Sequence, residues 1–220
     1  MTLKAVIVCA SPEAWIDEQR LKNQETIFIG VDRGALTLIK YKILPNLAIG
    51  DFDSVTAEEF QCISKNSLKT MRLHPEKDET DTELAISHAL SLSASKIDIY
   101  GGLGGRLDHS IANIRLLLRY SKKGISINLI NETNHMVILK PGNYTFEAFK
   151  HSYLSFFAIE ETVTDLTLSG VKYPLTKYTL TKYTLTQDDI RCVSNEVVLE
   201  NYHVAFSKGY LLMIRSQDLK

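Results

Sequence analysis

The first 130 residues alternate short apolar runs with stretches of helical periodicity, and this alternation limits the folds open to the chain. Each apolar run has the length of a strand and ends near Gly, Asp or Pro; the runs are residues 4–10, 26–32, 47–53, 69–75, 96–102 and 125–131. One helix is predicted to follow a capping box formed by Thr80 and Glu83. Another is predicted over 107–119, where one face carries Leu107, Ile111, Ile114 and Leu118. The alternation predicts a mainly parallel sheet covered by helices.

The alternation of strand-length and helical segments ends at about residue 134. Short segments rich in Tyr, Phe, Thr and Val follow, at 143–149, 152–159, 165–175, 191–199, 202–207 and 210–216. Because no helix-period stretch separates them, they predict an antiparallel β-domain of the sandwich type. The polar cluster NETNHM divides the chain into expected domains 1–133 and 134–220. TKYTL occurs twice in succession from residue 176, which we interpret as a lengthened hairpin or loop.

Composition excludes several classes of protein. Lys and Arg number 25 against 26 Asp and Glu, so no net field favours nucleic acid or an anionic membrane. No apolar run approaches the roughly 18 residues of a membrane helix. Cys9, Cys62 and Cys192 are odd in number and scattered, which argues against a disulfide framework. We therefore expect a cytoplasmic protein with no nucleic-acid or membrane partner.

Carboxylates gather where strands are predicted to end. Asp51 and Asp53 lie in GDFDS, Asp81 closes EKDETD, and Asp32 and Asp78 are nearby candidates for a supporting role. Parallel sheets bind ligands at the carboxyl ends of their strands. Close carboxylates raise one another's pKa unless a cation intervenes, and Mg²⁺ prefers such oxygen ligands. A capped turn is the alternative for Asp51 and Asp53.

A glycine-rich segment, GGLGGRLDH, leads into the helix predicted from residue 107. Gly102, Gly104 and Gly105 could let backbone N–H groups approach an anion at the helix N-terminus. The spacing matches neither the dinucleotide fingerprint nor the P-loop, and a structural turn explains the glycines equally well. Arg106 and Lys77 supply charges suited to phosphate. Together with the carboxylates, they favour Mg²⁺-dependent chemistry on a nucleotide phosphate.

The four clusters VDRG, GDFDS, KDETD and GGLGGRLDH, followed by KYPL at 172–175 and SNE at 194–196, resemble the thiamine pyrophosphokinase family. The resemblance spans nearly the whole chain. It implies a Rossmann-like three-layer α/β/α domain followed by an antiparallel β-sandwich, assembled as a homodimer. It also implies a Mg²⁺-dependent reaction in which ATP and thiamine give AMP and thiamine diphosphate.

The resemblance also implies roles for individual residues. Asp51, Asp53 and Asp81 would hold Mg²⁺ and the phosphates, one of the aspartates accepting the hydroxyl proton of thiamine. Arg106 and Lys77 would neutralise the phosphate chain. The nucleotide and phosphates would also meet Asp32, Arg33, Asp78, Gly102, Gly104, Gly105 and Asp108. Ser194 and Asn195 would line a thiamine site at the subunit interface, on the partner's β-domain.

The chain departs from the family pattern in two places, and two other functions compete. Arg33 stands where a glycine is usual. In addition, 18 residues separate KYPL from SNE, and this spacing exceeds that of the family pattern by the length of one TKYTL copy.

One alternative function is that of a metal-dependent nucleotide-sugar transferase, which also uses Asp-x-Asp. The other is a non-catalytic protein that binds nucleotide or thiamine.

Overall fold

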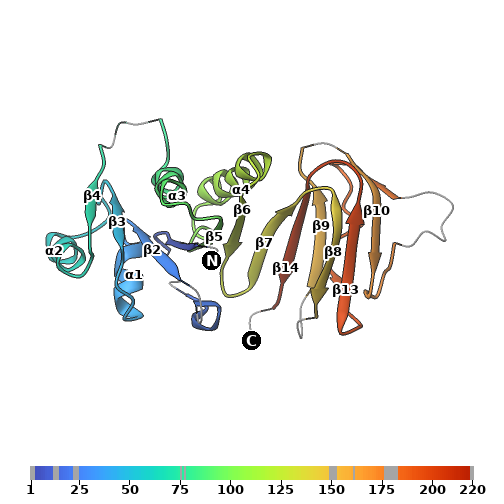
Figure 1. Cartoon of the computed structure of the whole chain (residues 1–220), viewed down its shortest axis with the longest axis horizontal. Coiled ribbons are helices and arrows are strands. Elements are labelled where there is room, and N and C mark those ends of the chain that lie inside the picture. The colour runs from blue at the N-terminus through green and yellow to red at the C-terminus, as the bar shows by residue number, and fades with distance from the viewer. Residues whose placement is uncertain are drawn as a thin grey trace. The chain divides into compact units, whose positions relative to one another are not determined.

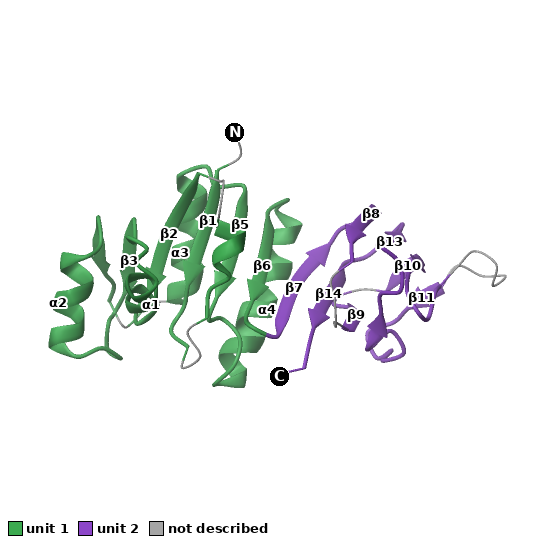
Figure 2. Cartoon of the chain, turned by 90° about the horizontal axis from the view of Figure 1, so that it is seen from below, with its two compact units in different colours: residues 1–132 green, residues 133–220 purple. Residues whose placement is uncertain are grey.

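The chain forms two compact units in a computed structural model, residues 1–132 and 133–220 (Figure 2). The structure describes residues 3–11, 15–21, 25–74, 76, 78–148, 153–160, 162–175 and 183–218. In this described part, no helix is both long and apolar enough to cross a lipid bilayer.

Unit 1 contains six parallel strands, in the spatial order β6-β5-β1-β2-β3-β4. Their bounds are β1 Lys4–Val8, β2 Thr26–Val31, β3 Leu47–Gly50, β4 Thr70–Arg72, β5 Lys96–Tyr100 and β6 Ser126–Ile130. All five residues of β1 are buried, as expected for an inner strand covered on both faces. The predicted parallel sheet and its strand segments are confirmed.

Helices cover both faces of this sheet (Figure 1). Their bounds are α1 Gly34–Lys40, α2 Ala57–Lys65, α3 Asp81–Ser91 and α4 Leu107–Lys122, with a short 3₁₀ helix at Glu18–Leu21. Parallel crossovers are right-handed, so α1 and α2, which lead toward β4, lie on the face opposite α3 and α4, which lead back toward β6. An ion pair between Arg119 and Glu83 joins α4 to α3.

Side-chain caps set the starts of two helices. Thr80 caps α3 by accepting a hydrogen bond from the Glu83 N–H (3.2 Å), which confirms the predicted start. Thr56 and Glu59 form a full capping box at the start of α2. Both caps lie just beyond strand ends, so the helix N-termini face the same edge of the sheet as the strand carboxyl ends.

The apolar face predicted for α4 is only partly buried. Leu107 and Ile111 are 75% and 54% exposed, and the helix buries Leu117 instead. The buried side chain of Asn113 donates a hydrogen bond to the Gly102 carbonyl (2.9 Å). Burying this amide is favourable only when it is paired, so the contact sets the rotation of the helix against the sheet.

Unit 2 contains two antiparallel arrangements of strands. One has the order β12-β9-β14-β7 and the other β11-β10-β13-β8. The bounds are β7 Asn134–Leu139, β8 Gly142–Glu147, β9 Tyr153–Ala158, β10 Val163–Ser169, β11 Tyr183–Leu185, β12 Asn195–Glu196, β13 Asn201–Phe206 and β14 Leu211–Ser216. Both sets bury side chains in one hydrophobic cluster, which includes Phe156 and Leu211 from the first and Leu166 and Val204 from the second.

Two features of unit 2 differ from the sequence prediction or refine it. Strand β7 begins inside NETNHM, the polar segment predicted to separate the domains, so a strand was missed there. The second TKYTL copy supplies β11, where Tyr183 and Leu185 pair with Leu166 and Val163 of β10 across a bulge. The first copy, 176–180, lies outside the described residues.

Candidate active site

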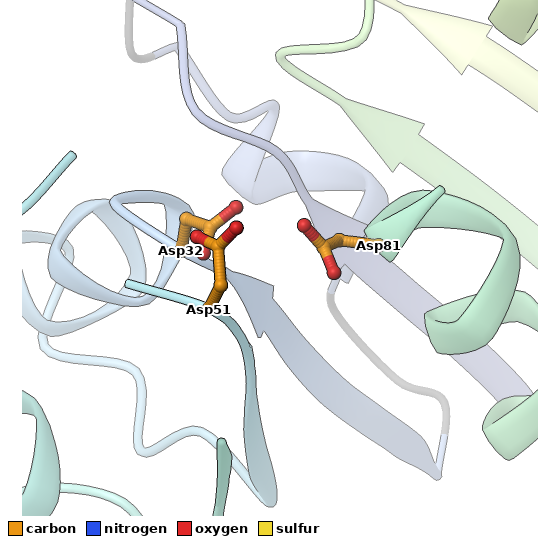
Figure 3. A group of neighbouring side chains, drawn as sticks. All are labelled: Asp32, Asp51 and Asp81. Atoms are coloured by element: carbon orange, nitrogen blue, oxygen red, sulfur yellow. The ribbon is translucent and has the colours of Figure 1, made fainter. Parts of the chain in front are cut away.

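Three half-buried aspartates converge at the carboxyl edge of the parallel sheet (Figure 3). Asp32 follows β2, Asp51 follows β3, and Asp81 is the first residue of α3. Each offers a carboxylate oxygen, and these oxygens lie within 4.8 Å of one another. Adjacent parallel strands end at one edge, and the α3 N-terminus favours the negative charge of Asp81.

Asp32 is held in place by the loop that follows the neighbouring strand β3. Its backbone lies in the left-handed region (φ 48°), and its Oδ1 accepts a hydrogen bond from the Phe52 N–H (3.1 Å). Gly50 leaves room for this carboxylate, since a Cβ there would lie 1.9 Å from Asp32 Oδ1. A glycine at the end of β3 is therefore a requirement of the cluster.

The electrostatics of the cluster are unfavourable without a cation. Burial raises the pKa of Asp32 to about 6, against the opposing effect of the Phe52 N–H. Repulsion from the nearby carboxylates raises the pKa of Asp32 further, with the largest effect from Asp81, then Asp51, then Asp53. Carboxylates crowded in this way are typical of sites that hold a metal ion or a cationic ligand.

The turn that carries Asp51 and Asp53 differs from its predicted geometry. An extended Asp-x-Asp segment would place both carboxylates on one side, but Phe52 adopts a left-handed conformation (φ 59°). Phe52 is buried against Phe60, so the chain turns around this anchored ring. Asp53 is exposed, outside the three-carboxylate group, and its N–H donates to Asp51 Oδ1 (3.0 Å).

A buried cysteine borders the cluster. Cys9 follows β1, and its Sγ lies 3.4 Å from Thr82 Oγ1. Burial is the main reason that the pKa of this thiol rises to about 11, and both Asp32 and Asp81 contribute further increases. Cys9 is therefore a neutral thiol at physiological pH, unsuited to act as a nucleophile.

The glycine-rich turn lies between β5 and α4. Gly102 is buried, and a Cβ there would approach Leu129 Cδ1 to 2.6 Å. Gly104 and Gly105 are exposed with positive φ values of 96° and 61°, and the space around them is open. The turn thus has a packed glycine at its base and two exposed glycines just before a helix N-terminus, an arrangement that suits an anion.

Arg106 and Asp108 form a two-point ion pair beside this turn. Arg106 Nε and Nη2 donate to the two Asp108 carboxylate oxygens at 3.1 and 2.5 Å, and both side chains are exposed. The guanidinium holds the pKa of Asp108 well below its usual range. An exposed pair of this kind contributes little to stability, so Arg106 can exchange its partner for a phosphate at small cost.

Arg33 is directed toward the β3–α2 loop. Its guanidinium donates to the Ser54 carbonyl (3.1 Å) and forms an ion pair with Glu59 (2.5 Å). The close backbone approach expected of a glycine falls instead at Gly34, where a Cβ would lie 1.8 Å from the Val8 carbonyl oxygen. The arginine at position 33 is thus compatible with the packing of α1.

The other predicted residues are spread more widely. Asp78 is exposed just before α3, and Lys77 lies outside the described residues. In unit 2, Ser194 is exposed with φ 56°, and its N–H donates to Ser155 Oγ (3.0 Å). Asn195 is buried, and its amide bonds to the backbone N–H and carbonyl of Tyr173 (3.0 and 2.8 Å). Its side chain supports the Ser194 turn.

Sequence reasoning missed two residues that shape the site, Asn113 and Glu59. Asn113 is an amide on the buried side of an amphipathic helix, a position that signals a specific hydrogen bond. Glu59 stands three residues after Thr56, the spacing of a capping box, and that signal was available in the sequence. Its pairing with Arg33 was not available, because the two residues lie on different elements.

Comparison with known proteins assigns both halves of the chain. Residues 18–129 match the model for the catalytic domain of thiamin pyrophosphokinase, and residues 140–211 match that for its vitamin B1 binding domain. A thiamine pyrophosphokinase from Bacillus subtilis is 39% identical over 96% of this chain and 98% of its own length. The chain belongs to the thiamine pyrophosphokinase family.

Solved structures of thiamine pyrophosphokinases share the fold. The crystal structure from Bacillus subtilis has a TM-score of 0.88 at 37% identity and covers 98% of this chain and 100% of its own. The one from Geobacillus thermodenitrificans has a TM-score of 0.84 at 34% identity, with 98% coverage of both chains. The family assignment thus favours a diphosphokinase over the nucleotide-sugar transferase and the non-catalytic binding protein.

Proposed function

We propose that this thiamine pyrophosphokinase transfers the pyrophosphoryl group of ATP to the hydroxyl of thiamine at the Asp32, Asp51 and Asp81 cluster. The hydroxyl oxygen attacks the β-phosphorus, the bond between the β-phosphorus and the bridging oxygen to the α-phosphate breaks, and AMP leaves. The observation that carries the proposal is the convergence of three carboxylates at the carboxyl edge of a sheet whose sequence matches the catalytic domain of the family.

The chemistry of the donor set fits Mg²⁺. Three hard oxygen ligands within 4.8 Å of one another repel, and a divalent cation relieves that repulsion. Asp32, Asp51 and Asp81 would hold the ion. Asp53, on the exposed side of the same turn, would help to hold the Mg²⁺–phosphate group. When bound, Mg²⁺ would neutralise charge on the transferring phosphates.

Residues of the chain would handle the remaining charges and the proton. An aspartate of the site accepts the thiamine hydroxyl proton and returns it to solvent. Arg106 leaves Asp108 and binds the phosphate chain, where a guanidinium can make two parallel hydrogen bonds. Gly104 and Gly105 let backbone N–H groups approach the same anion. Lys77 and Asp78 would border the nucleotide.

Unit 2 would supply the vitamin-binding half. We propose that unit 1 is a Rossmann-like three-layer domain and unit 2 a β-sandwich, the latter supported by the shared hydrophobic cluster. Ser194 and Asn195 would border thiamine in a homodimer, with Asn195 acting through the turn it supports. Cys9, Cys62 and Cys192 are free, as suits a cytoplasmic enzyme.

Product analysis tests the proposal. Chromatography of nucleotides should show AMP that appears only with ATP, thiamine and Mg²⁺ together. Asp81→Asn should lower the rate at least about 100-fold, the usual effect of removing a charged group from a phosphoryl-transfer site. Formation of ADP, or no turnover with any nucleotide, would refute the assignment. AMP formation unaffected by chelation would refute the metal.

A further inference from the structure

The loop that carries Asp51 is held by two adjacent residues of the neighbouring β2–α1 junction. Asp32 accepts the Phe52 N–H through Oδ1 (3.1 Å). Arg33 donates through Nη1 to the Ser54 carbonyl (3.1 Å). Successive side chains on one element therefore bind the backbone of the next loop at points two residues apart.

Glu59 completes this arrangement from the other side. Its Oε1 pairs with Arg33 Nη2 (2.5 Å), and its Oε2 accepts the Thr56 N–H (2.9 Å). One carboxylate thus connects the guanidinium to the N-cap of α2. Residues 51–56 are tied at their start by Asp32, in the middle by Arg33 and at the end by Glu59.

The loop needs such support because of its own backbone. Phe52 has φ 59°, a conformation that is unfavourable for a bulky residue and persists only when its surroundings hold it. Asp53 and Ser54 are exposed, so the protein core does not hold that side of the turn. The contacts of Arg33 fall on this exposed side.

We propose that Arg33 is a positioning residue, which acts with Glu59 to hold the 51–56 loop so that Asp51 meets Asp32 and Asp81. The proposal rests on the proposed function in taking Asp51 as a Mg²⁺ ligand. The ion pair is on the surface, with the Arg33 side chain 50% exposed, so its effect on global stability is small. Its effect on the position of one carboxylate is large, as is usual for residues that orient metal ligands.

The test compares Arg33→Met with the wild-type enzyme by two independent readouts. Backbone hydrogen exchange of the 51–56 segment, measured by mass spectrometry without metal or substrate, should become faster in the variant. The Mg²⁺ concentration for half-maximal AMP formation should rise about 10- to 100-fold. The melting temperature should fall by no more than about 4 °C.

Three further variants test whether Arg33 acts through Glu59. Glu59→Gln replaces one carboxylate oxygen with an amide NH₂ group and removes the charge, so Arg33 and the Thr56 N–H no longer have a separate acceptor oxygen each. If Arg33 and Glu59 act together, the double variant Arg33→Met with Glu59→Gln should need little more Mg²⁺ for half-maximal activity than either single variant. Fully additive effects in this cycle would contradict joint action. Arg33→Lys retains a donor and a charge, and it should recover part of the activity.

Arg119→Met is the matched control, because it also removes an exposed arginine from an ion pair with a glutamate, here between α4 and α3. It should leave the exchange of 51–56 and the Mg²⁺ requirement unchanged. The inference is refuted if backbone hydrogen exchange of residues 51–56 is the same in Arg33→Met as in the wild type. It is refuted equally if the only change in the variant is a higher KM for ATP. If wild-type AMP formation needs no Mg²⁺, the metal assignment fails, and the exchange result alone then decides whether Arg33 holds the loop.

Discussion

Replacing Asp32 with Asn should make the enzyme inactive but more stable at neutral pH. Asn retains the shape of the side chain and an Oδ1 that can accept the Phe52 N–H, so the main change is the loss of negative charge. That charge is unfavourable in the metal-free protein, because burial and then the nearby Asp81, Asp51 and Asp53 raise the pKa of Asp32 to about 6.

The size of the effect follows from that pKa. A rise from the ordinary value of 3.8 to about 6 corresponds to about 3 kcal/mol, at 1.36 kcal/mol per pKa unit. Asp32 is only partly buried, so solvent screening reduces this to about 1–2 kcal/mol. The folded state binds the proton more tightly than the unfolded state. Proton binding by Asp32 therefore stabilises the folded wild-type protein fully below pH 4, and this stabilisation is lost as the pH rises through 6.

Thermal unfolding from pH 4 to pH 8 in a chelator provides the assay. At pH 7.5, Asp32→Asn should melt about 2–6 °C above the wild type, and the two proteins should converge toward pH 4. Added Mg²⁺ should raise the melting temperature of the wild type more than that of the variant, because the ion binds the folded wild type more tightly. A difference that stays constant across this pH range, or a variant less stable at pH 7.5, would refute the reasoning.

Outcomes are expected for four further variants. Gly50→Ala places a Cβ 1.9 Å from Asp32 Oδ1, so the carboxylate must move, and urea unfolding should show a loss of about 2–4 kcal/mol. Asp51→Asn should lower kcat at least about 100-fold and weaken Mg²⁺ binding in calorimetry. Asp53→Asn should also lower kcat at least about 100-fold, and its melting temperature should change little because the Asp53 side chain is exposed. Deletion of 176–180 leaves one TKYTL copy to pair with β10, so kcat should be retained and the free energy of unfolding should change by less than about 1 kcal/mol.

Local patterns in the sequence were enough to predict the strands of unit 1 and where that unit would place its polar residues. Apolar runs such as 4–10 must be buried, and their alternation with helices leaves few arrangements other than a covered parallel sheet. The start of α3 was predictable because Thr80 caps a helix through a contact only three residues away. Such interactions depend on sequence neighbours, and sequence periodicity reports them directly.

The rotation of α4 required the tertiary structure. The sequence offers an apolar stripe through Leu107 and Ile111 that would suit a buried face, yet both side chains are exposed. On the buried side, Asn113 donates to the Gly102 carbonyl, 11 residues earlier. Because burial of an unpaired amide is costly, this hydrogen bond favours the rotation that also buries Leu116, Leu117 and Tyr120.

Short-range patterns were enough to predict that aspartates would gather at one edge of the sheet, because each follows a strand or begins a helix at that edge. Which of these aspartates meet depends on contacts between residues that are far apart in the chain. Asp32 joins Asp51 and Asp81, and Asp53 does not, because the buried Phe52 ring turns the backbone between the two acids of GDFDS into a left-handed conformation. That turn is stabilised from another element, so no pattern within GDFDS could report it.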